Sequence, residues 1–154
     1  MSSVALGKGE SLTRKATVDK EAYNKTVTYE SSDPTIVSVT KDGKIKGLKI
    51  GTATIKAVAS NGISKSYIVT VKKVPRKVSL TANTKIILVN GRVYLRTIFA
   101  EDEASYKLTY STSNKKIATV SKDGIVTARK KGTVTIKVKT FNGKTAKIKI
   151  KVVK

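Results

Sequence analysis

Lysine is the residue type that gives this chain its strongest chemical character. The 154 residues include 32 Lys and Arg against 10 Asp and Glu, a formal net charge of +22, and 27 of the 32 basic residues are Lys. An excess of this size attracts polyanions, namely nucleic acid, anionic cell-wall polymers, acidic polysaccharides or anionic membrane surfaces. The charge alone does not choose among these partners.

The lysines near the end of the chain alternate with aliphatic residues. In 133–139 and 146–152 every second residue is aliphatic or Ala, which is typical of strands with one buried face. A three-residue turn at 141–143 would place Lys137 opposite Lys147. Like charges directly opposite destabilise a sheet, so their presence favours an anionic ligand on this face. The lysines predicted to bind it are Lys137, Lys139, Lys147, Lys149 and Lys151.

The same strip of lysines has a simpler interpretation. Exposed lysines keep a sheet face solvated and prevent other chains from pairing with a strand edge. Residues 1–73 carry 13 basic and 6 acidic residues, a net +7, whereas 74–154 carry 19 and 4, a net +15. A polyanion-binding surface would therefore belong mainly to the second half, and both interpretations stay open at this point.

The residue types of common catalytic sites are missing. The chain has no His and no Cys, so the commonest general base and thiolate metal ligands are absent. Ser–His and Cys–His catalytic arrangements are thereby excluded. The ten carboxylates form no recognisable pair of the kind that glycosidases use. We therefore expect no catalytic residues, no cofactor and no enzyme activity.

Two other kinds of site, for Ca²⁺ and for nucleic acid, have little support in the sequence. The run Glu101-Asp102-Glu103 could offer oxygen ligands to Ca²⁺, but consecutive carboxylates do not converge by themselves, so we interpret it as a solvated loop and expect no metal site. Binders of single-stranded nucleic acid use exposed aromatics between basic residues, and the chain has only two Phe, six Tyr and five Arg. This composition disfavours nucleic acid as the partner.

An internal repeat determines the organisation of the chain. Residues 26–73 align with 107–154 at an offset of 81, without a gap, and 18 of the 48 aligned positions are identical. The shared dipeptides Asp42-Gly43 with Asp123-Gly124, and Asn61-Gly62 with Asn142-Gly143, are turn formers because both residue types accept left-handed backbone angles. Such a repeat indicates a duplicated domain.

Period-2 alternation between these turns predicts an all-β fold. We expect about seven short antiparallel strands in each copy, packed as a sandwich or a barrel. In the second copy the strands are predicted at 78–82, 86–89, 92–99, 107–111, 117–120, 125–128, 132–140 and 144–153, the first two being halves of one broken strand. The segment 18–24 is interpreted as a loop.

The predicted domains are 1–73 and 74–154, with the boundary near Pro75. Pro has no N–H for a β-ladder, so it fits a linker or the start of a strand. The first copy has no counterpart to the segment Val78–Leu80, and its first strand is therefore predicted to be truncated.

Both copies resemble the bacterial Ig-like domain, group 2, a module repeated in intimin- and invasin-like adhesins and in many Gram-positive surface proteins. The resemblance rests on Tyr29 with SSDPTIVSV, KDG and GTATI, and on Tyr110 with STSNKKIATV, KDG and GTVTI. The chain departs from the family pattern where Tyr29 and Tyr110 stand for a frequent Trp, and where the second copy lacks the Pro. The resemblance implies an Ig-like sandwich, an extracellular setting and a non-enzymatic role, but no particular ligand.

The expected biology follows from these features together. We expect a stalk, spacer or adhesion module of a bacterial cell-surface or secreted protein, in contact with other repeats of its parent chain and with an anionic cell-wall polymer or acidic glycan. No apolar run approaches the ~20 residues of a membrane helix, so we expect no membrane insertion. The start of the chain has no apolar core of a signal peptide, and we interpret the chain as a fragment of a longer protein.

Overall fold

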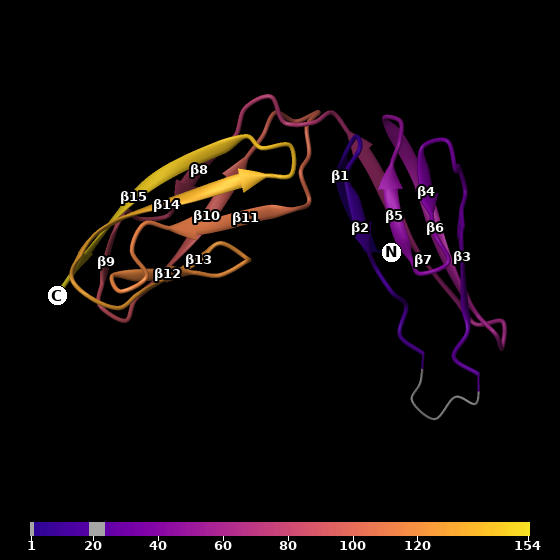
Figure 1. The fold of residues 1–154 in the computed structure, drawn as a ribbon, viewed down its shortest axis with the longest axis horizontal. Helices are drawn as coiled ribbons and strands as arrows, with labels where there is room; N and C mark the ends of the chain where they lie inside the picture. The colour runs from indigo at the N-terminus through magenta and orange to yellow at the C-terminus, as the bar shows by residue number, and fades with distance from the viewer. Residues whose placement is uncertain (1, 19–23) are drawn as a thin grey trace. The chain divides into compact units, whose positions relative to one another are not determined.

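The computed structural model describes residues 2–18 and 24–154, so most of the predicted loop at 18–24 lies outside the described residues. The described residues form fifteen strands and no helix. They divide into two compact units (Figure 1). Unit 1 comprises Met1–Val74 together with Asp102–Tyr106, and unit 2 comprises Pro75–Glu101 and Lys107–Lys154.

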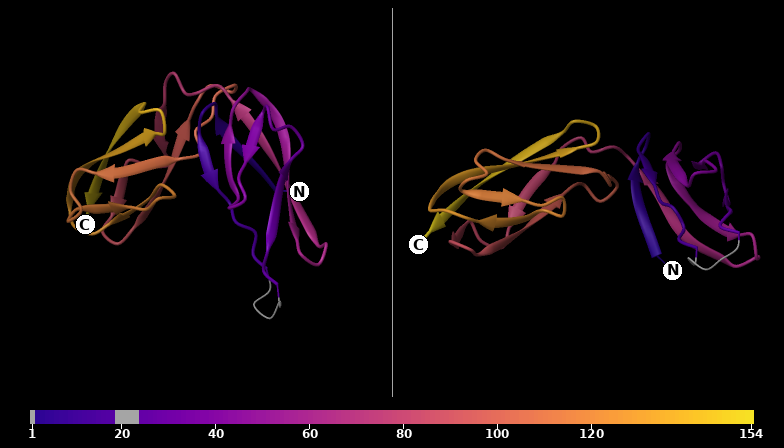
Figure 2. Two further views of the ribbon diagram at one scale, coloured as in Figure 1. Left: turned by 45° about the vertical axis from the view of Figure 1, so that its right-hand side comes forward. Right: turned by 60° about the horizontal axis from the view of Figure 1, so that its bottom comes forward.

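Unit 2 is a sandwich of two four-stranded sheets. In one sheet the order is β12 (Ala118–Val120), β13 (Ile125–Ala128), β10 (Arg92–Ile98) and β8 (Ser79–Ala82). In the other sheet it is β11 (Leu108–Thr112), β14 (Gly132–Thr140), β15 (Thr145–Val153) and β9 (Ile86–Leu88). The two sheets lie face to face (Figure 2). The predicted all-β fold is confirmed, and each strand boundary in this unit differs from its predicted position by at most one residue.

Unit 1 repeats this arrangement with one strand fewer. One sheet has the order β1 (Ser2–Gly7), β7 (Ser64–Lys72), β6 (Gly51–Ala59) and β3 (Val27–Ser31). The other has the order β2 (Ser11–Thr13), β5 (Lys44–Gly47) and β4 (Val37–Val39). Among the described residues of unit 1, no strand corresponds to β8.

The pairing of the strands differs from the prediction in one respect. Antiparallel pairing holds for every described strand pair except β1 with β7 and β9 with β15, which are parallel. In unit 2 strand β8 pairs with β10. The chain then crosses to the opposite sheet, where it forms β9. There it runs beside the last strand of the domain in the same direction, so the broken first strand contributes one half to each sheet.

The repeat extends further than the aligned sequences indicate. Ala5 pairs with Thr70 in unit 1, and Ile86 pairs with Lys151 in unit 2, so both partners are shifted by the same 81 residues. The two copies therefore share an ungapped register from β1 onward.

The alternating residues of the strands form a separate core in each unit. The buried cluster of unit 2 consists of Val78, Leu80, Ile87, Val93, Ala118, Val126, Ala128, Val134, Ile136, Val138, Ile148, Ile150 and Val152. That of unit 1 consists of Val4, Leu6, Val37, Ile45, Ala53, Ile55, Tyr67, Val69 and Val71. Burial of these side chains is the main stabilising term of each unit.

The repeated Tyr and the repeated Asp-Gly turn pack against each other, although they are distant in sequence. Gly124 has φ +76, and a Cβ on it would lie 3.1 Å from Cζ of Tyr110. Gly43 has φ +72, and its Cβ would lie 2.9 Å from Cζ of Tyr29. Two separate reasons therefore favour glycine at this position in each unit. The left-handed backbone disfavours other residues, and the Tyr ring leaves no room for a Cβ.

The interpretation of 101–103 as a solvated loop is wrong for Glu103. This residue is buried, and it forms a parallel β-bridge with Lys73. Backbone bonds run from Lys73 N to Asp102 O at 3.0 Å and from Ala104 N to Lys73 O at 3.0 Å, and Lys73 Nζ lies 2.8 Å from Asp102 Oδ2. The segment thus continues the pairing of unit 1 beyond β7, which composition alone could not indicate.

Glu10 is a second buried carboxylate of unit 1, and the sequence patterns did not predict its burial. Glu10 is 3% exposed, and its Oε2 accepts hydrogen bonds from Gly7 N at 3.0 Å and Tyr106 N at 2.9 Å. Backbone N–H groups of this kind satisfy a buried carboxylate. Glu10 therefore holds the β1–β2 turn and the segment Asp102–Tyr106 within one unit.

Substitution of Gly124 by Ala is expected to destabilise unit 2 by about 2 kcal/mol, because a left-handed backbone and the Tyr110 ring both oppose a Cβ there. In a domain of this size that loss lowers the melting temperature by about 10 °C, measurable by calorimetry. Gly143→Ala is the matched control, since φ is +87 there but a Cβ meets nothing within 4 Å. Equal losses in the two variants would contradict the role of the Tyr110 contact.

Candidate functional site

The predicted lysine face lies on the hairpin of β14 and β15. Lys137 pairs directly with Lys147, and Lys149 pairs with Thr135, so the predicted register is confirmed. The turn comprises three residues, with Thr140 N donating to Lys144 O at 2.9 Å and Gly143 at φ +87. We call the outward residues Lys137, Lys139, Lys147, Lys149 and Lys151 the lysine face.

No carboxylate of the described residues lies within salt-bridge distance of the lysine face. Lys139, Lys147, Lys149 and Lys151 are exposed and Lys137 is half-buried, while the alternate residues point into the core. On the neighbouring strand β11 the paired residues are polar and uncharged, with Ser111 beside Lys137. Among the described residues, none of these five lysines forms a salt bridge. The face therefore combines several positive charges with room for an anion.

An apolar margin borders the lysine face on β9. Ile86 is 58% exposed and pairs with Lys151, and Leu88 is 61% exposed. Their neighbour Ile87 is buried, so the alternation puts both aliphatic side chains on the outer face. A ligand on this sheet could therefore meet charge and apolar surface together.

Unit 1 provides an internal comparison for this face. The positions of Lys147, Lys149 and Lys151 are occupied there by Ser66, Ile68 and Thr70, at the same offset of 81 residues. Of the five lysine positions only that of Lys137 keeps a basic residue, Lys56. Because unit 1 forms the same scaffold without most of these lysines, the fold itself does not require them.

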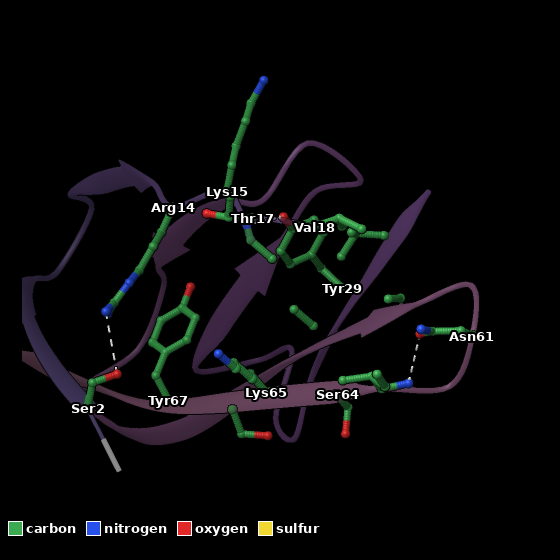
Figure 3. A pocket seen from close by; sticks show the side chains of 16 residues that line it. Ser2, Arg14, Lys15, Thr17, Val18, Tyr29, Asn61, Ser64, Lys65 and Tyr67 are labelled. Carbon is green, nitrogen blue, oxygen red and sulfur yellow. Dashed lines mark hydrogen bonds between the residues drawn. The ribbon is translucent and has the colours of Figure 1, made fainter. Parts of the chain in front are cut away.

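Unit 1 has a different feature, a pocket of about 490 Å³. One wall is the irregular segment 14–18 after β2, and the opposite wall comes from β3, β6 and the start of β7 (Figure 3). The polar lining residues include Arg14, Lys15, Lys65 and Asn61. The sequence patterns did not predict this pocket, although the missing counterpart to Val78–Leu80 was a signal for it.

Tyr67 lines this pocket from the side of the sheet. Its ring lies under the Arg14 guanidinium, 4.6 Å from ring centroid to Cζ, and Arg14 also donates to Ser2 Oγ at 3.4 Å (Figure 3). Tyr67 is 8% exposed, and its hydroxyl is buried without a hydrogen-bond partner among the described residues. Burial raises the pKa of Tyr67 above its usual value of 10.0, although the positive charge of Arg14 opposes this.

Among the described residues, the pocket lining and the lysine face contain no carboxylate side chain. Within the described residues, no group of three or more Asp and Glu side chains is placed to hold a metal ion. None of the residues that the structure describes forms a helix long and apolar enough to span a membrane.

Two sandwiches of this strand order, one after the other, define the chain as a tandem immunoglobulin-like module. The chain belongs to the family of bacterial Ig-like domains (group 2), whose model matches residues 1–71 and 76–151. The resemblance inferred from the Tyr, Asp-Gly and Gly-Thr motifs is thereby confirmed.

Individual proteins similar to this chain are much longer than it is. An uncharacterised protein of Clostridium acetobutylicum is 31% identical over 139 residues, which are 88% of this chain and 14% of that protein. Kappa-carrageenase of Pseudoalteromonas carrageenovora is 47% identical over 57 residues, which are 36% of this chain and 14% of the enzyme. The chain thus spans about a seventh of the first of these relatives.

Among solved structures, a 282-residue C-terminal fragment of intimin, in complex with the intimin-binding domain of the translocated intimin receptor, is 20% identical. The match covers 89% of this chain and 55% of that one, with a TM-score of 0.42.

Tyr67→Phe is expected to leave unit 1 at least as stable at pH 7, because it removes a buried hydroxyl that has no partner. The raised pKa means that the folded state keeps the phenol proton while the unfolded state releases it near the usual 10.0. The stability of unit 1 should therefore fall as the pH rises above about 10, and less steeply in Tyr67→Phe. Melting temperatures measured from pH 8 to 11 test this; parallel curves for the two proteins would contradict it.

Proposed function

We propose that the chain is a non-catalytic spacer of a bacterial cell-surface or secreted protein, built to bear tension between its ends. The observation that carries this proposal is the parallel pairing of β1 with β7. Six consecutive residue pairs join them, from Ser2 with Tyr67 to Gly7 with Lys72. Tension enters unit 1 at the start of β1 and leaves at the end of β7, which are opposite ends of this ladder. The hydrogen bonds are therefore loaded together in shear rather than one after another.

The second unit supports the same proposal. β9 and β15 are parallel in the corresponding position, so tension that passes β8 loads this ladder in shear as well. Membership in the bacterial Ig-like family and the lack of a His or Cys agree with a structural role. The length of the relatives agrees with a module that forms one part of a larger protein.

Single-molecule pulling tests the spacer function. Stretching the whole chain should give two unfolding events, each releasing on the order of 200 Å, since extended chain spans ~3.3–3.6 Å per residue. The chain has no Cys, so single anchors can be introduced. Pulling unit 1 between its N-terminus and Val74→Cys loads β1 and β7 in shear, whereas pulling between the N-terminus and Lys65→Cys peels them apart. The shear geometry should need at least about twice the force; equal forces would refute the proposal.

A second candidate function is the binding of an anionic cell-wall polymer or acidic glycan by the lysine face. The observation that favours it is the direct pairing of Lys137 with Lys147 on a face that carries no acidic residue. In unit 1 the corresponding pair is Lys56 with Ser66, so the same scaffold forms without this repulsion. Kappa-carrageenan is a reasonable probe, since an enzyme named for it contains a similar segment.

Chromatography on immobilised kappa-carrageenan, polygalacturonate and heparin tests this second function. The chain should be retained at ~0.15 M salt, where isolated exposed charges are largely screened. The triple variant Lys137→Gln, Lys147→Gln, Lys149→Gln should elute at clearly lower salt. Lys115→Gln, Lys116→Gln, Lys122→Gln is the control of equal net charge, changed in the turns around β12. Equal losses in both variants, or no retention of the original chain, would contradict a specific role of the face.

A further inference from the structure

The two units differ at the outer edge of β10 and of its counterpart. In unit 2 this edge is covered by β8, with Leu95 paired to Ala82 and Thr97 to Leu80. The offset of 81 residues makes 14–17 the counterpart of 95–98. Arg14 N donates to Gly43 O just as Leu95 N donates to Gly124 O, so the two segments begin alike.

Beyond Arg14 the edge in unit 1 has no strand beside it. Among the described residues, neither Lys15 nor Thr17 takes part in a backbone–backbone hydrogen bond. Their counterparts Arg96 and Ile98 pair with β8. Unpaired backbone groups of this kind form a template on which a further strand can add.

The segment that covers this edge in unit 2 also completes the core. Val78 and Leu80 are buried in the same cluster as Ile148, and β8 lies against β15 as well as β10. In addition, Asn142 Nδ2 donates to Pro75 O at 2.8 Å, which holds the start of the segment. Three contacts thus hold the segment 75–82: its pairing with the edge of β10, the burial of Val78 and Leu80 in the core, and the hydrogen bond from the Asn142 side chain.

The pocket of unit 1 lies where unit 2 holds this segment. Its walls, 14–18 and 64–67, are the counterparts of 95–99 and 145–148, between which β8 packs. Asn61, the counterpart of Asn142, lines the pocket. The buried Tyr67 hydroxyl, which has no hydrogen-bond partner in the described part of the chain, also belongs to the lining and can bond to a peptide group there (Figure 3).

We infer that this pocket is an acceptor for one extended polypeptide strand, antiparallel to 14–17, with aliphatic side chains directed inward at alternate positions. The duplication identifies the occupant as the segment joined directly ahead of β1, because β8 is joined to β9 by only three residues, 83–85. Their counterparts 2–4 pair with β7 here, so we expect Ser2, Ser3 and Val4 to leave β7 and form the crossover when the strand is bound. In a row of such domains, the stretch that leaves one domain then becomes the first strand of the next. This inference rests on the proposed spacer function, for which it specifies how neighbouring repeats are joined.

The register of the bound strand follows from that of β8. The position equivalent to Ala82 is residue 1, and those of Leu80 and Val78 lie two and four residues before it. Replacing Met1 by the eight residues of 75–82, Pro-Arg-Lys-Val-Ser-Leu-Thr-Ala, after a new initiator Met, puts this strand in register in the otherwise complete chain. The matched control carries Asp in place of the Val and the Leu of the added segment, so that the backbone is present without the aliphatic side chains.

The extension should raise the melting temperature of unit 1 by about 8 °C or more, because it buries two aliphatic side chains and satisfies an edge. Amide exchange of Lys15 and Thr17 should slow by on the order of tenfold or more, and that of unit 2 should not change. The Asp control should show neither effect. The free peptide of 75–82, added at millimolar concentration, should reproduce the protection of Lys15 and Thr17 only weakly.

Several results would overturn the inference. No change in exchange at Lys15 and Thr17, or the same stabilisation by the Asp control, would mean that no strand adds at this edge. Stronger protection by the free peptide than by the joined extension would mean that the pocket receives a separate polypeptide. The force measurements on the unextended chain do not depend on these results, so a failure here is distinguishable from a failure of the spacer function.

Discussion

The burial of every second side chain in the hairpin of β14 and β15 is the constraint on which the rest of unit 2 depends. Val134, Ile136, Ile148 and Ile150 are almost completely removed from solvent. A shift of one residue would turn all of them outward, so the register is strongly determined. The same register directs the lysine face outward and puts Lys137 against Lys147. The position of the charges is thus a consequence of the core.

The corresponding hairpin of β6 and β7 shows which parts of this arrangement the fold needs. Its inward residues keep the aliphatic pattern, whereas its outward residues have lost or never acquired most of the lysines. The Tyr–Gly contact beneath the Asp-Gly turn is kept in both units, because a left-handed glycine and an aromatic ring of this size restrict each other. The aliphatic core and the Tyr–Gly contact are therefore common to both units, whereas most of the outward lysines occur only in unit 2.

The entry side of the two units differs for another reason. In unit 2 the polypeptide supplies its own edge strand and two further core residues before it crosses to the second sheet. In unit 1 Arg14 and Tyr67 stand where unit 2 has Leu95 and Ile148, and the space between the sheets stays open. A buried hydroxyl without a partner costs free energy unless another group enters to bond it. This cost links the open edge, the pocket and Tyr67 in one explanation.

Local pattern and repetition were sufficient to predict the strands, the turns, the duplication and the outward direction of the lysines, because alternation and left-handed glycines are properties of neighbouring residues. The sequence by itself could not reveal the parallel ladders at β1 and β9, since pairing direction depends on which sheet the chain crosses into. Nor could it predict the burial of Glu10 and Glu103, whose partners are distant residues of the chain. Only the tertiary structure brought 14–18 and β7 together around a pocket, because the space between two sheets depends on how side chains such as Arg14 and Tyr67 pack across it, whereas the repeat showed only that a counterpart of Val78–Leu80 is missing.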